Sequence, residues 1–376
     1  MTSQITTEEI IELGLDSGLT AVGVCSAEKL AMSESILESR KKKGLNSDMQ
    51  FTYRNPSRSC DPFKVLPSAK SLVAAAFSYG DATQASYETL KDEAGSAVVA
   101  RYARNESYLG LRDSLNEIAA KLKGLGFKAV VVSDSNALVD REVAWRAGIG
   151  WYGKNSNLLS SETGSWTVLG SVVTNAELEP TSGPMQDGCG SCTKCIDYCP
   201  TNAIIAPGVV DASRCISWLV QSKEPIPLEF RVAVGTRIYG CDDCQEICPP
   251  NRVKFGESKD NLNSQNALID IFWMLSANNE ELITKCETWY FPERNPDYIR
   301  RTALVALGNS AVEKDLRTVN TLKRFLSSEN VLLRSHAVWA VKRLGLQSLL
   351  TDINLDDQGI IQMELDADVP LRSIPV

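Results

Sequence analysis

Residues 189–200 read Cys-Gly-Ser-Cys-Thr-Lys-Cys-Ile-Asp-Tyr-Cys-Pro, so cysteines stand at 189, 192, 195 and 199, the last directly before a proline. This C-x2-C-x2-C-x3-C-P spacing is typical of bacterial ferredoxins with two 4Fe-4S clusters, where three thiolates hold one cluster and the fourth ligates the other. A zinc site would use two CxxC pairs and has no need of the Cys-Pro ending. In a reducing compartment, clustered cysteines indicate metal more often than disulfides. The stretch therefore predicts iron–sulfur ligation.

An altered second copy of this run follows at Cys241-x2-Cys244-x3-Cys248-Pro249. Its first cysteine would fall at position 238, which is isoleucine, and Cys215 is the remaining candidate upstream. The predicted ligands are therefore Cys189, Cys192, Cys195 and Cys248 for the first cluster, and Cys199, Cys215, Cys241 and Cys244 for the second. Two clusters act as one-electron carriers in series. A ferredoxin-type segment does not account for 376 residues, so the electrons must serve another site.

Three of the 11 cysteines, Cys25, Cys60 and Cys286, fall outside these runs. Each stands alone in an apolar or mixed context. We interpret them as small buried hydrophobic residues, which is how isolated cysteines usually pack.

Length and composition indicate an ordinary globular chain of two or three domains. It has 376 residues, of which 43% are hydrophobic and 23% charged. No apolar run approaches the ~18 residues of a membrane span. The N-terminus has neither a basic n-region nor an apolar h-region, so we expect no secretory signal and a cytoplasmic protein.

Strands that alternate with helices predict an α/β (α+β) first domain over residues 1–178. The expected strands are 20–25, 71–77, 128–134 and 165–174, and the expected helices are 7–18, a charged helix ending near 43, 110–124 and 138–147. Residues 179–187 are turn-rich and open a ferredoxin-type domain that we place at 179–264. Residues 265–350 predict helices, in which 300–308 and 333–345 resemble two copies of a solenoid repeat. Residues 351–376 are an acidic tail, expected to be loosely held.

Charge is unevenly spread over the chain. The net charge is −8, but residues 295–345 carry nine Lys and Arg against four acids, which makes that segment +5 and the rest −13. A basic module on an acidic body can hold an anionic partner.

A glycine-rich stretch, Gly148-Ile-Gly-Trp-Tyr-Gly153, matches the GxGxxG spacing. A dinucleotide fingerprint needs a strand before it, whereas a helical stretch precedes this one. Asn155 stands where a P-loop needs Ser or Thr. Neither nucleotide interpretation holds. A loop that lines a bulky cofactor or a tight turn remains, and the residue types favour the turn.

Asp134 ends an apolar strand, with Asp140-Arg141 six residues on. Taken alone, such a carboxylate is more often a helix cap or one half of a surface ion pair. The functional alternative is a carboxyl group beside an apolar cofactor, with its pKa raised by desolvation so that it can donate a proton. The chain's single histidine, His336, excludes most histidine-based chemistry, and we expect it to be a helix residue without a catalytic role.

At this level of detail the chain resembles the epoxyqueuosine reductase family of cobalamin-dependent, iron–sulfur, tRNA-modifying enzymes. The likeness runs through nearly the whole sequence, and the displaced Cys215 is its most specific part. The other residues that carry it are Arg58, Leu66–Lys70, Arg101-Tyr102, Asp134, Asp140-Arg141, Arg146–Gly150, Lys154-Asn155, Arg214–Ser217 and Tyr239–Cys244, with the cysteine runs. One departure is visible. The family usually has Asp-Tyr-His where this chain has Ser107-Tyr108-Leu109.

The resemblance implies a nitroreductase-like domain that binds cobalamin, a ferredoxin-like domain with two 4Fe-4S clusters, and C-terminal HEAT-like repeats that dock the tRNA anticodon stem-loop. It implies an oxidoreductase that reduces epoxyqueuosine in tRNA to queuosine, with an external electron donor. Asp134 matches the family's proton donor. The expected cobalamin contacts are Arg58, Asp134, Lys154, Asn155, Leu158, Ser217, Lys223 and Asp242. With His336 far from the first domain, cobalamin should bind base-off, its lower face water-bound or empty.

Two alternatives stay open. A corrinoid reductive dehalogenase would share a cobalamin domain followed by ferredoxin clusters, although such enzymes are normally exported through a twin-Arg signal that this sequence lacks. A non-catalytic electron-transfer or scaffold protein would share the clusters and the repeats but would retain no cobalamin.

Overall fold

A computed structural model describes residues 5–80, 85–254, 266–310, 315–351, 353–356 and 359–372. Two compact units emerge from the contacts between residues. The first unit comprises residues 1–83, 105–213 and 243–261, and the second comprises residues 84–104, 214–242 and 262–376. These units interleave along the chain, whereas the predicted domains are consecutive. The predicted boundaries at 178 and 264 remain a prediction.

A four-stranded sheet forms the centre of the first unit, in the order β1-β2-β7-β4. The strands are β1 (Ala21–Ser26), β2 (Ser71–Ser78), β7 (Thr167–Thr174) and β4 (Ala129–Ser133), and every neighbouring pair is antiparallel. Both faces of β2 are buried, because Leu72 and Ala74 alternate with Val73 and Ala75 and all four are 0% exposed. Such near-continuous apolar strands need a helical layer on each face.

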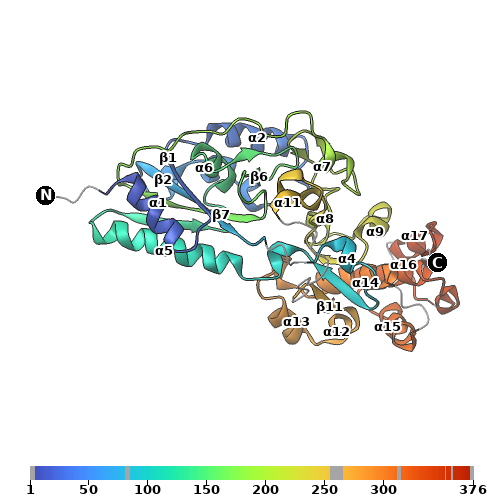
Figure 1. Ribbon diagram of the computed structural model, residues 1–376. Coiled ribbons are helices and arrows are strands. Elements are labelled where there is room, and N and C mark those ends of the chain that lie inside the picture. The colour runs from blue at the N-terminus through green and yellow to red at the C-terminus, as the bar shows by residue number, and fades with distance from the viewer. Residues whose placement is uncertain are drawn as a thin grey trace. The chain divides into compact units, whose positions relative to one another are not determined.

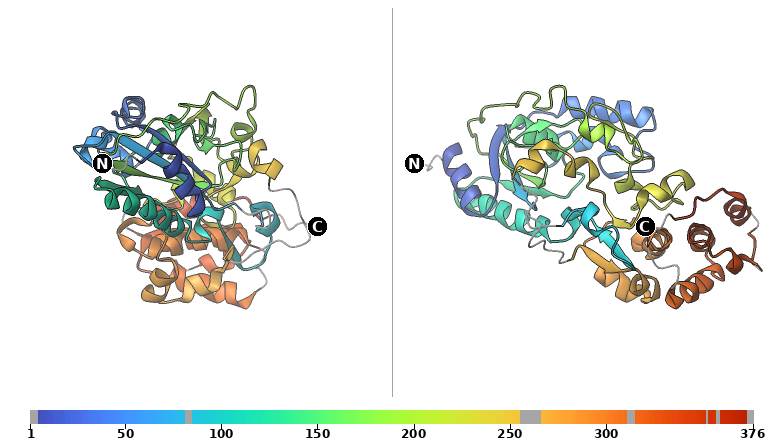
Figure 2. Two further views of the ribbon diagram at one scale, coloured as in Figure 1. Left: turned by 60° about the vertical axis from the view of Figure 1, so that its left-hand side comes forward. Right: turned by 45° about the vertical axis from the view of Figure 1, so that its right-hand side comes forward.

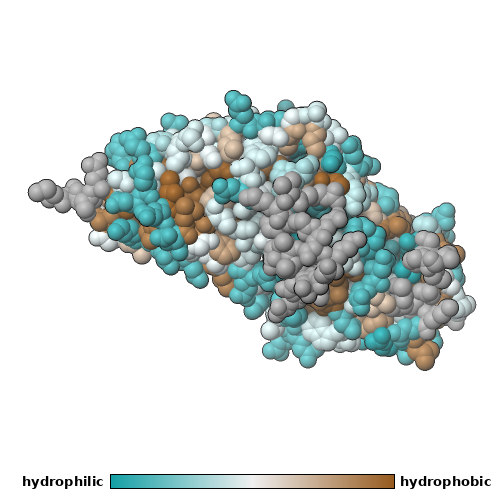
Figure 3. Space-filling model, viewed as in Figure 1, coloured by the Kyte–Doolittle hydropathy of each residue, from teal (hydrophilic) through white to brown (hydrophobic). Residues whose placement is uncertain are grey.

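Helices cover both faces of this sheet, as Figures 1 and 2 show. The helices α1 (Thr7–Asp16) and α5 (Ser107–Gly124) pack on one face, and α6 (Asp140–Arg146) packs on the other. Thr6 and Glu9 close α1 with reciprocal side-chain bonds, the capping-box arrangement that satisfies free N–H groups at a helix start. Seen from the side of Figure 1, hydrophilic side chains surround a smaller apolar area beside α1 (Figure 3).

The remaining elements of the first unit are short and lie around this sheet. They are α2 (Ala31–Lys42), η1 (Phe51–Tyr53), α3 (Pro56–Ser59), η2 (Pro62–Lys64), β5 (Trp151–Tyr152), β6 (Leu158–Leu159), α7 (Lys194–Asp197), β8 (Ile204–Ala206), β9 (Val209–Val210), α10 (Asp243–Glu246) and α11 (Pro249–Lys254). The cysteine runs fall on α7 and α10 and on the loops beside them, and these two helices pack together.

The second unit combines a three-stranded sheet with a group of helices. The sheet order is β10-β3-β11, with β3 (Ser96–Val99) between β10 (Arg237–Tyr239) and β11 (Leu268–Asp270). The helices are α4 (Tyr87–Leu90), η3 (Arg101–Ala103), α8 (Ile216–Leu219), α9 (Leu228–Val234), α12 (Ile271–Ser276), α13 (Asn279–Lys285), η4 (Pro292–Arg294), α14 (Asp297–Asn309), α15 (Leu316–Leu326), α16 (Val331–Arg343), η5 (Gln347–Leu350) and α17 (Ile360–Asp366).

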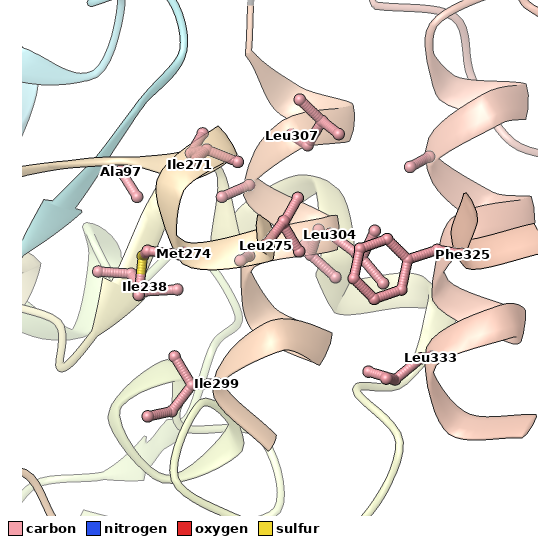
Figure 4. Close-up of a cluster of buried hydrophobic side chains, with 14 of the residues drawn as sticks. Ala97, Ile238, Ile271, Met274, Leu275, Ile299, Leu304, Leu307, Phe325 and Leu333 are labelled. Carbon is pink, nitrogen blue, oxygen red and sulfur yellow. The ribbon is translucent and has the colours of Figure 1, made fainter. Parts of the chain in front are cut away.

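One apolar core joins the strands and helices of this second unit. Figure 4 shows Ile238 from β10, Met274 and Leu275 from α12, Leu304 from α14 and Phe325 from α15 pointing into it. The predicted repeat helices correspond to α14 and α16, which pack against each other. Gly308 permits this contact, because a Cβ there would lie 2.6 Å from the Trp339 ring.

Two sequence expectations for this region are wrong. The C-terminal segment is not loosely held, since α17 buries Ile361 completely and Glu364 forms a bidentate ion pair with buried Arg231, at 2.9 and 2.7 Å. The uniformly helical character expected for 265–350 is broken by β11. A partner strand distant in sequence stabilises so short a strand, so local periodicity does not reveal it.

Candidate functional site

Four cysteines of the first unit converge on one cavity. The cavity has a volume of about 230 Å³, and Cys189, Cys192, Cys195 and Cys248 line it. These are the four residues predicted from spacing to ligate the first cluster. Gly188 closes one side of the cavity without a side chain, since a Cβ there would lie 2.6 Å from the Trp151 ring. The cavity therefore brings three consecutive CxxC cysteines together with one from the distant second run.

The chemistry of this donor set fits an iron–sulfur cluster. Desolvation, with the neighbouring cysteines adding to it, raises the pKa of Cys248 to about 12 and raises the pKa of Cys195 as well. Thiols grouped in this way hold their protons until a metal displaces them. No three His, Cys, Asp or Glu side chains of the described residues form a group tight enough for a single metal ion. A cubane cluster instead places its four thiolates at separate corners of a larger body.

The glycine-rich stretch lines this same cavity. Trp151, Lys154 and Asn155 lie along it, and the Lys154 Nζ donates to the Gly190 carbonyl at 2.6 Å. Gly150 is required by close packing, because a Cβ there would lie 2.2 Å from the Leu159 carbonyl oxygen. The stretch forms the tight β5–β6 hairpin. The turn interpretation therefore holds, but the turn also forms a wall of the cluster cavity.

Trp151 is a feature of this wall that the sequence did not single out. Its side chain is 8% exposed, and its Nε1 is buried without a hydrogen-bond partner among the described residues. A buried N–H without a partner carries a desolvation cost. A sulfur atom of a bound cluster would supply an acceptor, which is a second observation that fits the cluster to this cavity.

The predicted ligands of the second cluster are divided between the units. Cys199 and Cys244 belong to the first unit, and Cys215 and Cys241 belong to the second. The Cys199 sulfur accepts a hydrogen bond from the Ala203 backbone N–H at 3.2 Å, and Asn155 donates to the Cys244 carbonyl at 3.2 Å. Backbone N–H bonds to sulfur are typical of cluster ligands. The assignment of this second set to one cluster stays a prediction.

Asp134 follows directly after β4, at the edge of the sheet. Its φ of 47° lies in the left-handed region, which aspartate tolerates better than most residues. The carboxyl is exposed and makes no hydrogen bond or ion pair among the described residues. The cap of α6 is Val139 without a side-chain bond, so the helix-cap interpretation is wrong. Partial burial raises the pKa of the Asp134 carboxyl, and the Arg112 charge opposes this.

Asp140, the first residue of α6, is a second carboxyl beside the first. Its Oδ1 is buried without a hydrogen-bond partner among the described residues. Burial, and after it the charge of Asp134, raises the pKa of Asp140 well above its ordinary value. Asp140 forms no ion pair with a described residue, so the surface ion pair considered for this part of the chain is not found at Asp140. The buried Ser133 hydroxyl on the other side of Asp134 also has no partner there, so Asp134 is flanked by polar groups that a bound ligand could satisfy.

The other predicted cobalamin contacts fall in both units. Arg58 is exposed on α3, and the neighbouring Ser59 hydroxyl donates to the Asn136 carbonyl at 2.6 Å, which ties α3 to the loop after Asp134. Leu158 is 6% exposed and packs in the core of the first unit. In the second unit, Ser217 lies on α8, Lys223 lines a cavity of about 300 Å³, and buried Asp242 accepts from the Arg101 N–H at 2.7 Å.

His336 is a buried structural residue, as expected. It is 0% exposed, its Nε2 accepts from the Ile226 N–H at 3.2 Å, and its Nδ1 lies 2.7 Å from the Leu332 carbonyl. Both ring nitrogens are therefore engaged within the second unit. No side-chain imidazole is left to ligate cobalt, which fits the expected base-off cobalamin.

Part of the positive charge of the basic segment 295–345 is buried inside the second unit, at Arg300, Arg301 and Arg334. Arg301 is 0% exposed and donates to the carbonyls of Leu219, Val220, Ser222 and Glu224. Arg300 is 9% exposed and pairs with Asp297 at 3.0 Å. Arg324 donates to the Leu275 carbonyl, and Arg317 pairs with Asp315. Lys314 lies outside the described residues. Arg300 and Arg301 are therefore not free to face an anionic partner, whereas Arg317, Lys323 and Arg324 are exposed. The expectation that this segment holds an anionic partner stays a prediction.

Comparison with known proteins supports this arrangement. Residues 59–135 match the family described as "Epoxyqueuosine reductase QueG, DUF1730", and residues 188–251 match a "4Fe-4S double cluster binding domain". The chain therefore carries a two-cluster iron–sulfur domain. No helix among the described residues is long and apolar enough to cross a membrane.

Full-length relatives and solved structures agree. The epoxyqueuosine reductase of Vibrio cholerae is 33% identical over 342 residues, covering 89% of this chain and 90% of the relative. That of Bacillus cereus is 30% identical, covering 90% and 89%. A crystal structure of an epoxyqueuosine reductase with an epoxyqueuosine-modified tRNA-Tyr stem-loop matches at a TM-score of 0.81 and 29% identity, over 96% of this chain and 97% of that one. A Bacillus subtilis structure, with its catalytic aspartate loop swung out of the active site, matches at 0.80 and 28%, over 95% and 96%. This chain belongs to the epoxyqueuosine reductase family.

Proposed function

We propose that this chain reduces epoxyqueuosine to queuosine in tRNA, with electrons passed through two 4Fe-4S clusters to cobalamin. The observation that carries the proposal is the presence, in one compact unit, of the four-cysteine cavity and the exposed, unpaired Asp134 carboxyl. The proposed substrate is taken from the epoxyqueuosine reductases, which align with about nine-tenths of this chain. The related stem-loop complex supports tRNA as the partner.

The reaction requires both electrons and protons. Conversion of an epoxide to an alkene takes up two electrons and two protons and releases the oxygen as water. Hydroxide is a poor leaving group, so a proton must reach the oxygen as its bonds to carbon break. The Asp134 carboxyl can supply one proton, because its raised pKa increases the protonated fraction. The second proton comes from solvent.

Asp140 supports this role of Asp134. Desolvation of the buried Asp140 carboxyl disfavours its ionised form and raises its pKa well above the ordinary value. Any negative charge on Asp140 opposes ionisation of the neighbouring Asp134, as like charges do. The exposure of Asp134 keeps the carboxyl accessible to a substrate and lets it recover a proton from water.

Cobalamin, when bound, supplies a strongly reducing cobalt centre. The residues proposed to hold it are Arg58, Asp134, Lys154, Asn155, Leu158, Ser217, Lys223 and Asp242. The partnerless hydroxyl of Ser133 and carboxyl oxygen of Asp140 offer further polar contacts beside Asp134. His336, with both ring nitrogens engaged in the second unit, would not be among the residues that hold the cofactor.

The proposal implies two partners besides the cofactors. One is the tRNA anticodon stem-loop that carries epoxyqueuosine, and the other is an external reductant that reloads the clusters. We place the enzyme in the cytoplasm, where tRNA is modified.

The test is turnover by anaerobically reconstituted protein. Incubation with cobalamin, a chemical reductant and epoxyqueuosine-containing tRNA should yield a nucleoside lighter by one oxygen atom, detected by mass analysis of digested tRNA. Omission of cobalamin should abolish the product while iron and sulfide contents stay constant. Protein that carries both clusters but binds no corrin and forms no product would instead be an electron-transfer or scaffold protein. Corrin binding with turnover of an organohalide, but not of the tRNA, would favour the dehalogenase alternative.

A further inference from the structure

A second cationic segment lies in the first unit. Residues 40–64 carry seven Lys and Arg against two acids, a net charge of +5 on a chain of net charge −8. Its charge therefore equals that of segment 295–345. The two segments differ in where the structure places their cations.

The cations of this segment face solvent without partners. Lys41, Lys42, Lys43, Arg54 and Lys64 are all exposed. None of these side chains forms an ion pair or hydrogen bond with another described residue, whereas the neighbouring Arg40 donates to the Gly208 carbonyl. We call these five residues the α2 surface. Their charge is fully available to an external anion.

Helix electrostatics do not account for the α2 surface. Lys41 and Lys42 end α2 and Lys43 caps it, where one or two cations complement the helix dipole. Arg54 follows η1 and Lys64 ends η2, so neither lies on α2. Both η1 and α3 pack against α2, and the Leu30 N–H, at the start of α2, donates to the Cys60 carbonyl just before η2 at 2.8 Å. The cations are therefore spread along α2 and the short elements tied to it.

Two exposed aromatic rings accompany these cations. Phe51 in η1 is 48% exposed and Phe63 in η2 is 41% exposed. Exposed rings beside unpaired cations are the combination that single-stranded nucleic acid uses, since bases stack on the rings while Lys and Arg contact the phosphates.

The α2 surface is also linked to the proposed acid. Ser59, on α3 between Arg54 and Lys64, is 2% exposed and donates to the Asn136 carbonyl at 2.6 Å, two residues after Asp134. A nucleotide that reaches Asp134 brings its flanking backbone toward this region of the first unit. Since α3 packs against α2 and η1, the Ser59 bond connects the α2 surface to the loop that follows Asp134.

We propose that the α2 surface binds the anticodon-loop strand that flanks the modified nucleotide, with phosphates on Lys41–Lys43, Arg54 and Lys64 and bases on Phe51 and Phe63. This inference rests on the proposed tRNA function. It assigns the loop strand to exposed, partnerless cations of the first unit.

The test compares two charge-matched variants of the reconstituted holoenzyme. The first is Lys41→Gln/Lys42→Gln/Lys43→Gln. The control is Lys121→Gln/Lys123→Gln/Lys128→Gln, which removes three exposed, unpaired lysines at the C-terminal end of α5 in the same unit. The probe is the isolated anticodon stem-loop, and its affinity is measured over a range of salt concentrations.

We expect the α2 variant to bind the stem-loop about tenfold or more weakly at low salt, with the slope of log affinity against log salt reduced by about 2 to 3. The control should change neither quantity. Phe51→Leu/Phe63→Leu should weaken binding by roughly tenfold without altering the slope. Equal effects of the two triple variants, or a loss seen with full-length tRNA alone, would overturn the assignment. Failure of the proposed function is distinct, because wild-type protein would then not reduce the epoxide at all.

Discussion

Asp140 lies close enough to Asp134 for the negative charge of Asp134 to raise the pKa of the Asp140 carboxyl. Two carboxyls in such proximity titrate as a pair, and the more buried one keeps its proton longest. In this pair the buried member is Asp140, with an unsatisfied Oδ1, and the exposed member is Asp134. The arrangement separates a proton held in the interior from a carboxyl that can meet substrate.

Asp140→Asn should stabilise the protein, and more so as the pH rises. The folded state holds the Asp140 proton well above the ordinary carboxyl pKa of 3.8, so the folded state binds more protons than the unfolded state. Wild-type stability is therefore lost with rising pH above that value, at up to about 1.4 kcal/mol per pH unit. Asparagine has no such cost. The urea midpoints of the wild type and the variant, measured at about pH 5 and pH 8, test this prediction. A difference between the two proteins that becomes smaller as the pH rises would contradict it.

Iron content should depend on the cysteines of the cavity and not on the isolated ones. We expect about eight irons per wild-type chain. Cys248→Ala should lower this to about half, because Cys248 joins Cys189, Cys192 and Cys195 in the cavity. Cys286→Ala is the matched control, since Cys286 is 0% exposed and burial raises its pKa to about 12. Iron and sulfide analysis after anaerobic reconstitution checks both, and iron loss in Cys286→Ala would refute the ligand assignment.

Trp151→Phe should lower the reduction potential of the first cluster. The indole N–H is buried without a partner at the wall of the cysteine cavity. Hydrogen bonds to cluster or thiolate sulfur stabilise the reduced, more negative state and so raise the potential. Phenylalanine keeps the ring that packs on Gly188 but cannot donate. An EPR-monitored redox titration should show a fall on the order of 30 mV, with unchanged iron content. An unchanged reduction potential would show that the Trp151 N–H does not donate to the cluster.

The iron–sulfur cavity was predictable because its ligands obey a fixed spacing imposed by the geometry of the cluster. The isolated cysteines were predictable too, since Cys25, Cys60 and Cys286 are all buried. The α/β layering followed from the apolar strands, but the all-antiparallel order of the main sheet did not, because alternation of strands and helices does not fix strand direction.

Charge counting alone did not show which cations are exposed. Segments 40–64 and 295–345 each carry +5, yet a sequence does not show which guanidinium groups turn inward. Arg301 satisfies four backbone carbonyls that follow α8, and that demand arises only after folding. Leu109, which stands where the family usually has histidine, is 47% exposed at the start of α5.

Arg301→Met should destabilise the second unit and leave the RNA salt dependence unchanged. Loss of the guanidinium leaves four carbonyls after α8 without their donor, at a cost of about 2–4 kcal/mol. Lys323→Gln is the comparison within the same segment, because Lys323 is exposed and its side chain has no partner among the described residues. The midpoint temperature of thermal unfolding should fall markedly for Arg301→Met and little for Lys323→Gln. If Arg301→Met were as stable as the wild type, the buried carbonyl contacts of Arg301 would not contribute to stability.

Asp134→Asn should remove turnover while leaving the cofactors in place. The epoxide oxygen needs a proton as it leaves, and the exposed Asp134 carboxyl, with its pKa raised by partial burial, can supply one whereas an amide cannot. Asparagine keeps the size and tolerates the left-handed φ of 47° at this position. Stem-loop affinity, iron content and cobalt reduction should therefore survive, while turnover falls by roughly 100-fold or more.

The wild-type rate should also decline as the pH rises, because the protonated carboxyl is the active form, and the variant should lose that dependence. Near-normal turnover in Asp134→Asn would remove the carboxyl from the chemistry. Loss of corrin binding would instead assign it to cofactor placement.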